Sequence, residues 1–265
     1  MPFLQARSHR LYYADSHPEG SPPDLTFIFI HGLGSSQNYY FPVLPHLTNH
    51  HRCITIDTYG AGRSPYTDET VSIPSIADDV IGALDTLKVP KAIVVGHSMG
   101  GLAALDLGAR YPDRVSGVVA IGPVHPSETL VNVMSKRADT VLESLAGMEP
   151  MANTIPFAAV GSRSTELQKA FIRELVLGQD PKGYAALCRA IASAQPADYA
   201  AVQAPFLLIA GGEDKSAPLE GCRHIFDQVS SQKKTLEVLK NVGHWHCIEA
   251  ADEVGELLAK FAGTL

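Results

Sequence analysis

The stretch Val95-Gly96-His97-Ser98-Met99-Gly100-Gly101 decides the fold class of this 265-residue chain. The apolar, β-branched run Ala92–Val95 is typical of a buried strand, and leucine and alanine recur at helical spacing after the glycines. Ser98 therefore stands where a strand turns sharply into a helix. Larger side chains two positions away would block such a turn, so Gly96 and Gly100 are a steric requirement. The pattern predicts a nucleophilic serine; the alternative is a glycine-rich turn that only joins two elements.

The composition describes a globular protein and excludes several classes of partner. Hydrophobic residues make up 45% of the chain, charged residues 18%, and the formal net charge is −7. The acidic balance argues against nucleic acid, which needs a basic face. No apolar run approaches the roughly 18 residues that cross a bilayer, and residues 1–10 lack the apolar core of a signal peptide. We therefore expect a cytoplasmic protein without a membrane or nucleic-acid partner.

The cysteines are too widely spaced for a paired metal motif or a small disulfide framework. They are Cys53, Cys188, Cys222 and Cys247. We expect free thiols in a reducing compartment, with no structural metal.

Strands and helices alternate on both sides of the Ser98 turn. Strands are predicted at Leu25–Ile30, Arg52–Ile56, Val115–Ile121, Pro205–Ala210 and Thr235–Leu239, after one or two edge strands within Leu4–Ala14. Helices are predicted at Gln37–Thr48, Pro74–Leu87, Leu219–Val229 and Glu249–Gly263. This order predicts an α/β fold with a mostly parallel central sheet, right-handed crossovers and flanking helices.

The alternation is interrupted between about residues 123 and 201. Three helical patterns occur there, at Glu128–Leu145, Thr165–Leu177 and Pro181–Ala194, and no convincing strand. An insertion beyond the carboxyl edge of the strands forms a cap over the ligand site. We therefore expect a core of residues 1–122 and 202–265 with a helical cap of residues 123–201. Apolar cap residues, among them Met151, Phe157 and Val160, either line the substrate pocket or form the cap's own core.

Two backbone N–H groups are candidates for an oxyanion hole. The loop His31-Gly32-Leu33-Gly34-Ser35-Ser36 follows a buried strand, and its glycines allow a ligand to approach the N–H of Leu33. The N–H of Met99 lies at a helix N-terminus, where negative charge is stabilised. The alternative for the first loop is a plain glycine turn.

A serine hydroxyl needs a base within hydrogen-bond reach, and that base needs a group that fixes its tautomer. Asp214 follows a buried strand and is the candidate acid, with Glu213 as its neighbouring rival. His244 follows the last predicted strand and is the candidate base. The order serine, acid, histidine is that of one hydrolase architecture.

Five motifs in this order resemble the α/β-hydrolase superfamily over nearly the whole chain: HGLGSS at 31–36, DTYGAGRS at 57–64, GHSMGG at 96–101, GGEDKSAP at 211–218 and GHWHCIE at 243–249. The resemblance implies that Ser98 is the nucleophile, His244 the general base and Asp214 its orienting acid. It also implies that the N–H groups of Leu33 and Met99 form the oxyanion hole. A serine rather than an aspartate at the turn disfavours the haloalkane dehalogenase and epoxide hydrolase relatives.

Several further residues are candidates for the pocket or for packing around it. His97 and Trp245 adjoin the nucleophile and the base, with structural packing as the alternative for His97. His246 stands where many relatives have proline, and is either a pocket or a loop residue; His31 is expected to anchor its loop. Part of the cap, residues 171–184, resembles 3-oxoadipate enol-lactonases. Arginines that either receive a substrate carboxylate or are solvated are Arg137, Arg163, Arg173 and Arg189.

The resemblance implies a cofactor-free serine hydrolase that cleaves a small carboxylic ester or lactone through an acyl-enzyme intermediate. Its partner is then a small molecule. Two alternatives are a carbon–carbon bond hydrolase that uses the same residues, and a receptor of the same fold that binds a ligand without turnover.

Overall fold

The Ser98 turn lies near the middle of a mixed sheet. Over residues 2–17 and 23–265, which the computed structural model describes, the sheet has eight strands in the order β1-β2-β4-β3-β5-β6-β7-β8. Their bounds are β1 Phe3–Gln5, β2 Arg10–Ser16, β3 Thr26–Ile30, β4 Arg52–Ile56, β5 Ala92–His97, β6 Val115–Ile121, β7 Phe206–Gly211 and β8 Lys234–Leu239. The β1–β2 and β2–β4 pairs are antiparallel and the other pairs are parallel.

Helices cover both faces of this sheet. Successive strand residues point to opposite faces, and on β6 a Cβ at Gly117 would contact Phe261 of α10 (Ala251–Ala262), whereas the next residue, Val118, packs against Gly108 of α2 (Met99–Arg110). Helix α1 (Ile73–Thr86) packs beside α2, and α8 (Leu219–Gln228) against β7. Burial on both faces explains why the parallel strands are almost wholly apolar.

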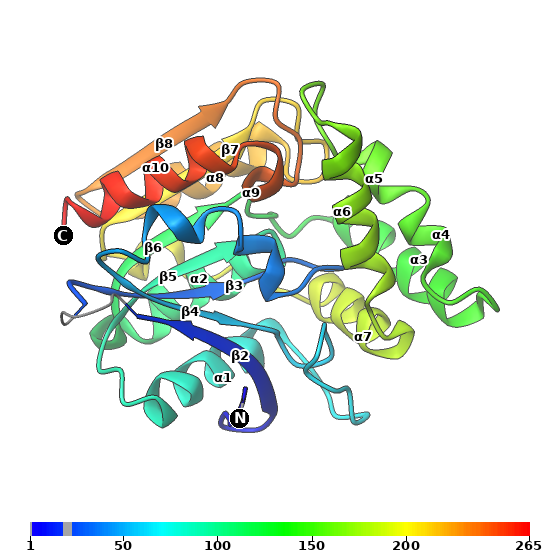
Figure 1. The fold of residues 1–265 in the computed structure, drawn as a ribbon, viewed down its shortest axis with the longest axis horizontal. Helices are drawn as coiled ribbons and strands as arrows, with labels where there is room; N and C mark the ends of the chain where they lie inside the picture. The colour runs from blue at the N-terminus through cyan, green and yellow to red at the C-terminus, as the bar shows by residue number, and fades with distance from the viewer. Residues whose placement is uncertain (1, 18–22) are drawn as a thin grey trace.

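Between β6 and β7 the chain forms a helical insertion (Figure 1). Its helices are α3 (Glu128–Glu143), α4 (Glu149–Ala152), α5 (Ile155–Ala158), α6 (Glu166–Leu177) and α7 (Pro181–Ala192). Helices α3 and α7 make the most extensive contact with each other. The insertion lies beyond the carboxyl ends of the parallel strands (Figure 1), so the predicted fold class is confirmed. The division into a core and a cap at residues 123 and 201 stays a prediction.

One of the predicted helices is wrong in detail. Gln37–Thr48 contains two short 3-10 helices, η1 (Gln37–Tyr40) and η2 (Leu44–His46), instead of one α-helix. Pro42 and Pro45 lack the backbone N–H that the interior of one continuous α-helix would use, which explains the break. The last predicted helix, Glu249–Gly263, corresponds to α10; a short helix, α9 (His246–Glu249), precedes it and is separated from it by Ala250, whose φ of −141° is not helical.

The four cysteines are free and buried. Among the described residues, no helix is both long and apolar enough to cross a membrane.

Candidate active site

Ser98 occupies a strained turn between β5 and α2. Its φ of 53° and ψ of −112° lie in a region that costs a non-glycine residue roughly 1–3 kcal/mol. A Cβ on Gly96 would collide with the carbonyl of Gly100, and a Cβ on Gly100 with the carbonyl of Ile30. The N–H of Ser98 donates to the carbonyl of Ile121 at 3.0 Å, which holds the strained residue against the next strand. Both glycines are therefore required for steric reasons, as the sequence predicted.

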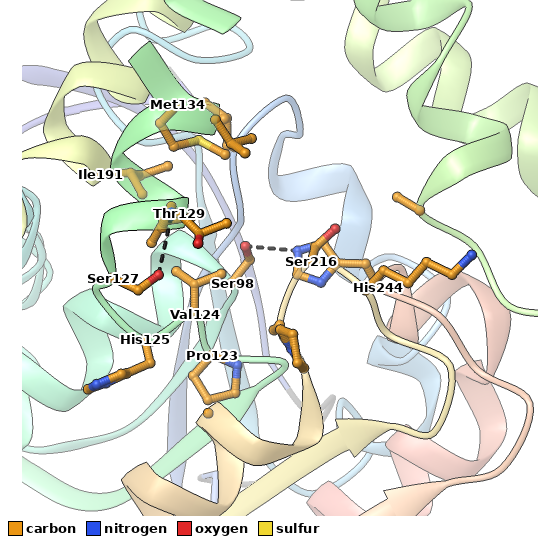
Figure 2. Close-up of a pocket in the computed structure, with 18 of the residues that line it drawn as sticks. Ser98, Pro123, Val124, His125, Ser127, Thr129, Met134, Ile191, Ser216 and His244 are labelled. Atoms are coloured by element: carbon orange, nitrogen blue, oxygen red, sulfur yellow. Dashed lines mark hydrogen bonds between the residues drawn. The ribbon is translucent and has the colours of Figure 1, made fainter. Parts of the chain in front are cut away.

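The structure brings Ser98, His244 and Asp214 together from the ends of three strands. The Oγ of Ser98 lies 2.9 Å from Nε2 of His244 (Figure 2), and Nδ1 of His244 lies 2.8 Å from Oδ2 of Asp214. A carboxylate only accepts, so Nδ1 carries the hydrogen and Nε2 is free to accept the serine hydroxyl. This is the tautomer that a general base needs.

Asp214 is held as a carboxylate by its surroundings. Its second oxygen, Oδ1, accepts the N–H groups of Ser216 at 2.8 Å and Ala217 at 2.9 Å. Burial acts to raise the pKa of Asp214, but the adjoining His244, then His246 and the Ala217 N–H, outweigh it and bring the pKa below its ordinary value. The rival carboxylate, Glu213, turns away and accepts from the N–H of Ser162 at 2.6 Å.

The loop that carries His244 is fixed through its main chain. The N–H of His244 donates to the carbonyl of Ala159 in the insertion at 2.8 Å. The flanking N–H groups of Gly243 and Trp245 donate to the carboxylate of Glu249 at 3.0 and 2.9 Å. Sequence reasoning did not assign Glu249 a role. The feature that could have indicated one is that Glu249 is a single acidic residue in the apolar run that follows the histidine loop.

The two candidate oxyanion donors belong to a loop beside Ser98 and to the helix that follows it. Leu33 lines the cavity beside the serine, and Met99 is the first residue of α2, so its N–H has no carbonyl partner one turn earlier in the helix. His31 anchors the Leu33 loop: its Nδ1 donates to the carbonyl of Gly32 at 2.8 Å, and its Nε2 accepts the N–H of Thr58 at 3.1 Å. Burial lowers the pKa of His31, which keeps this imidazole neutral.

A cavity of about 610 Å³ opens above Ser98 between the sheet and the insertion. This is the size of a small-molecule site. Apolar side chains of the insertion form one wall, among them Leu130, Val133, Met134, Ile155, Ala159 and Ile191. Figure 2 shows Met134, Ile191, Ser127 and Thr129 among the lining residues around Ser98. Among the described residues, no group of three or more histidine, cysteine or acidic side chains has the geometry to hold a metal ion.

Only one of the predicted lining residues lines this cavity. Trp245 lines it, whereas His97, Met151, Phe157 and Val160 are not among its lining residues. Phe157 is 62% exposed, because Ile155, two positions earlier on the helical turn, takes the inward side.

Sequence reasoning named Arg137 as a candidate but missed the apolar wall that the same helix, α3, forms. Its lining residues Leu130, Met134 and Arg137 recur at helical spacing, and that spacing was the available signal.

Among the four candidate arginines, Arg137 lines the cavity. Arg163 pairs with Glu253 at 2.7 Å and Arg173 with Glu149 at 2.9 Å, whereas Arg189 is exposed and is not a lining residue. Arg137 has no carboxylate partner in the described part of the chain. A cation without a carboxylate partner beside the apolar side chains of α3 suits an anionic group on a ligand.

A largely parallel sheet with a serine on the sharp turn after β5, and helices inserted after β6, is an α/β-hydrolase fold. The chain belongs to the family described as serine aminopeptidase, S33, whose model matches residues 21–251.

Known relatives of this chain include hydrolases of several substrates. It is 28% identical over 251 residues to 3-oxoadipate enol-lactonase 1 of Acinetobacter baylyi, covering 94% of this chain and 91% of the relative. It is 27% identical over 258 residues to a 2-hydroxy-6-oxononadienedioate/2-hydroxy-6-oxononatrienedioate hydrolase of Paraburkholderia phymatum, covering 90% and 87%. The solved structure of the enol-lactonase from Burkholderia xenovorans LB400 matches with a TM-score of 0.90 at 25% identity, covering 99% of this chain and 100% of that one.

Proposed function

We propose that this protein is a serine hydrolase that cleaves a small carboxylic ester or lactone through an acyl-enzyme intermediate. The observation that carries the proposal is the 2.9 Å contact between Ser98 Oγ and a His244 imidazole whose other nitrogen meets Asp214 at 2.8 Å. A hydroxyl, a base and an orienting carboxylate in this arrangement suit acyl transfer.

In the proposed reaction, Ser98 Oγ attacks the carbonyl carbon while Nε2 of His244 takes the hydroxyl proton. The N–H groups of Leu33 and Met99 donate to the oxyanion that forms. The tetrahedral intermediate collapses, the ester C–O bond breaks, and His244 gives its proton to the leaving oxygen. A water molecule, deprotonated by His244, then attacks the acyl-enzyme and releases the carboxylic acid together with free Ser98. No cofactor takes part in these steps.

The substrate side of the proposal draws on the cavity and the relatives. The volume of the cavity, about 610 Å³, and its apolar wall suit a small substrate. Arg137 lines the cavity and can receive a carboxylate of that substrate. The enol-lactonase relatives favour a lactone. We therefore expect a lactone or ester that carries a carboxylate to be turned over with a lower KM than its neutral methyl ester. Replacing Arg137 with methionine should remove that difference.

The test is hydrolysis of p-nitrophenyl acetate by the purified protein and by S98A, followed by a panel of lactones, short esters and vinylogous diketones. We expect turnover by the parent and its loss in S98A. Undiminished turnover in S98A contradicts the proposal. A preference for diketones over every ester and lactone would establish the carbon–carbon hydrolase alternative, and labelling of Ser98 by a fluorophosphonate without any turnover would establish the receptor alternative.

A further inference from the structure

Two buried imidazoles donate to the same main-chain oxygen, the carbonyl of His244. Nε2 of His97 lies 2.8 Å from this oxygen, and Nδ1 of His246 lies 2.8 Å from it. His97 is the last residue of β5, directly before the proposed nucleophile, whereas His246 is the first residue of α9. Side chains from two different elements therefore hold the carbonyl of the residue proposed as the base.

The bonding pattern defines the tautomer of each ring. A carbonyl oxygen only accepts, so His97 carries its hydrogen on Nε2 and His246 carries its hydrogen on Nδ1. Burial, followed by the nearby imidazoles, lowers the pKa of His97 well below its ordinary value. Burial also lowers the pKa of His246, although Asp214 acts in the opposite direction. Both rings are therefore neutral, and each has a single N–H to donate.

The remaining ring nitrogens, Nδ1 of His97 and Nε2 of His246, are buried without a hydrogen-bond partner in the described part of the protein. Nε2 of His246 lies 4.0 Å from Oδ2 of Asp214, beyond hydrogen-bond distance, and both rings pack closely against glycine backbone. A Cβ at Gly32 would lie 2.7 Å from Nδ1 of His97, and a Cβ at Gly122 would lie 2.5 Å from Cε1 of His246. A buried polar atom without a partner lowers the free energy of unfolding. Each ring has one such nitrogen, and its other nitrogen donates to the His244 carbonyl.

We propose that His97 and His246 are positioning residues which, through the N–H that each donates to the His244 carbonyl, hold the His244 ring in register with Ser98. This inference rests on the proposed function, because it assigns a role relative to the proposed base. The N–H of His244 is already held by Ala159, and the neighbouring N–H groups by Glu249. The two imidazoles complete the restraint of this backbone. A displacement of the base by about 1 Å costs on the order of 100-fold in rate.

A packing role for the same two rings makes a different prediction. The ring of His97 stacks on Tyr39 with 4.4 Å between centroids, so loss of ring volume alone also perturbs the site. Amide isosteres separate the two roles, because the amide nitrogen of glutamine overlies Nε2 of a histidine and that of asparagine overlies Nδ1. H97Q and H246N keep the donor at the position used here, whereas H97N and H246Q move it.

The experiment measures kcat and KM for p-nitrophenyl acetate, the rate of fluorophosphonate labelling and Tm for the four variants. We expect H97N and H246Q to lose about 10- to 100-fold in kcat and in labelling rate, with KM changed less than about threefold. H97Q and H246N should stay within about fivefold of the parent. H9N and H9Q are the control pair, because His9 is a buried imidazole outside the site that bonds to Asp79; they should change Tm and leave kcat unchanged.

Equal losses in both isosteres at each position, following Tm, would overturn the inference in favour of packing. So would parental kcat in all four variants. Failure of the proposed function gives a different result, since the parent itself would then not hydrolyse the ester. If a variant at one histidine does not fold, the pair of isosteres at the other histidine still decides between the two roles.

Discussion

The carboxylate of Glu249 accepts a hydrogen bond from the backbone N–H of Gly161 at 2.7 Å, which ties the insertion to the loop of His244. The same carboxylate also accepts from the Ser164 hydroxyl at 2.9 Å and from the N–H groups of Gly243 and Trp245. Glu249 is buried, so each of these donors depends on it rather than on water. A single side chain therefore connects the insertion with the loop of the proposed base.

Replacing Glu249 with glutamine should reduce both stability and activity. The amide NH2 of glutamine faces N–H donors that it cannot satisfy, so we expect the free energy of unfolding to fall by about 2–4 kcal/mol. Urea denaturation measures this change, and p-nitrophenyl acetate turnover should fall with it. The control is E253Q, because Glu253 forms an exposed pair with Arg163 and should contribute less than about 1 kcal/mol. Equal effects of E249Q and E253Q would show that the buried carboxylate does not have the importance inferred here.

The choice of Asp214 over Glu213 gives a second prediction. D214N keeps the shape of the side chain but favours the wrong tautomer of His244, so we expect kcat to fall by about 10⁴-fold. E213Q should stay close to the parent, because Glu213 contacts Ser162 and not the imidazole. Steady-state kinetics on one ester compares them. A loss in E213Q that matched the loss in D214N would refute the assignment.

Two methionines test the boundary of the cavity. Met134 lines the cavity and Met151 does not, although both lie in the insertion. M134A should enlarge the cavity and shift the preferred acyl chain length of p-nitrophenyl esters by changing kcat/KM about 10- to 100-fold. M151A should leave the chain-length profile unchanged. The cavity boundary described here would be wrong if M151A shifted the profile and M134A did not.

Buried neutral imidazoles make stability depend on pH. Burial is the main cause that lowers the pKa values of His31, His97 and His246 below the ordinary 6.5. The unfolded chain therefore binds more protons below pH 6.5 than the folded chain, and the free energy of unfolding should fall as the pH falls through that value. Each histidine contributes up to about 1.4 kcal/mol per pH unit.

Urea denaturation between pH 5 and pH 8 measures this dependence, and H246N isolates one histidine. The slope below pH 6.5 should be shallower in H246N than in the parent by up to about one proton's contribution. Identical slopes in the two proteins would mean that His246 is protonated in the folded state.

The meeting of Ser98, Asp214 and His244 was predictable because each follows a strand of a parallel sheet, and such strands end at one edge. The strand positions were predictable because buried parallel strands form continuous apolar runs. Phe157 was expected either in the pocket or in the core of the insertion, and its exposure was not predictable, since a four-residue helix gives too little periodicity to define its inward side. The partners of His97 and His246 were not predictable, because both donate to a backbone carbonyl, which every residue possesses.

The most direct test of the central claim is to trap the acyl-enzyme. The protein is mixed with p-nitrophenyl acetate, quenched in acid during turnover and digested, and the peptide containing Ser98 is examined by mass spectrometry. We predict an acetyl group on Ser98 in the parent and no acetylated peptide in S98A. In H244A, Ser98 should be acetylated slowly and the acetyl group should then accumulate. Turnover with no acetyl group on Ser98, or undiminished turnover in S98A, would contradict the proposed function.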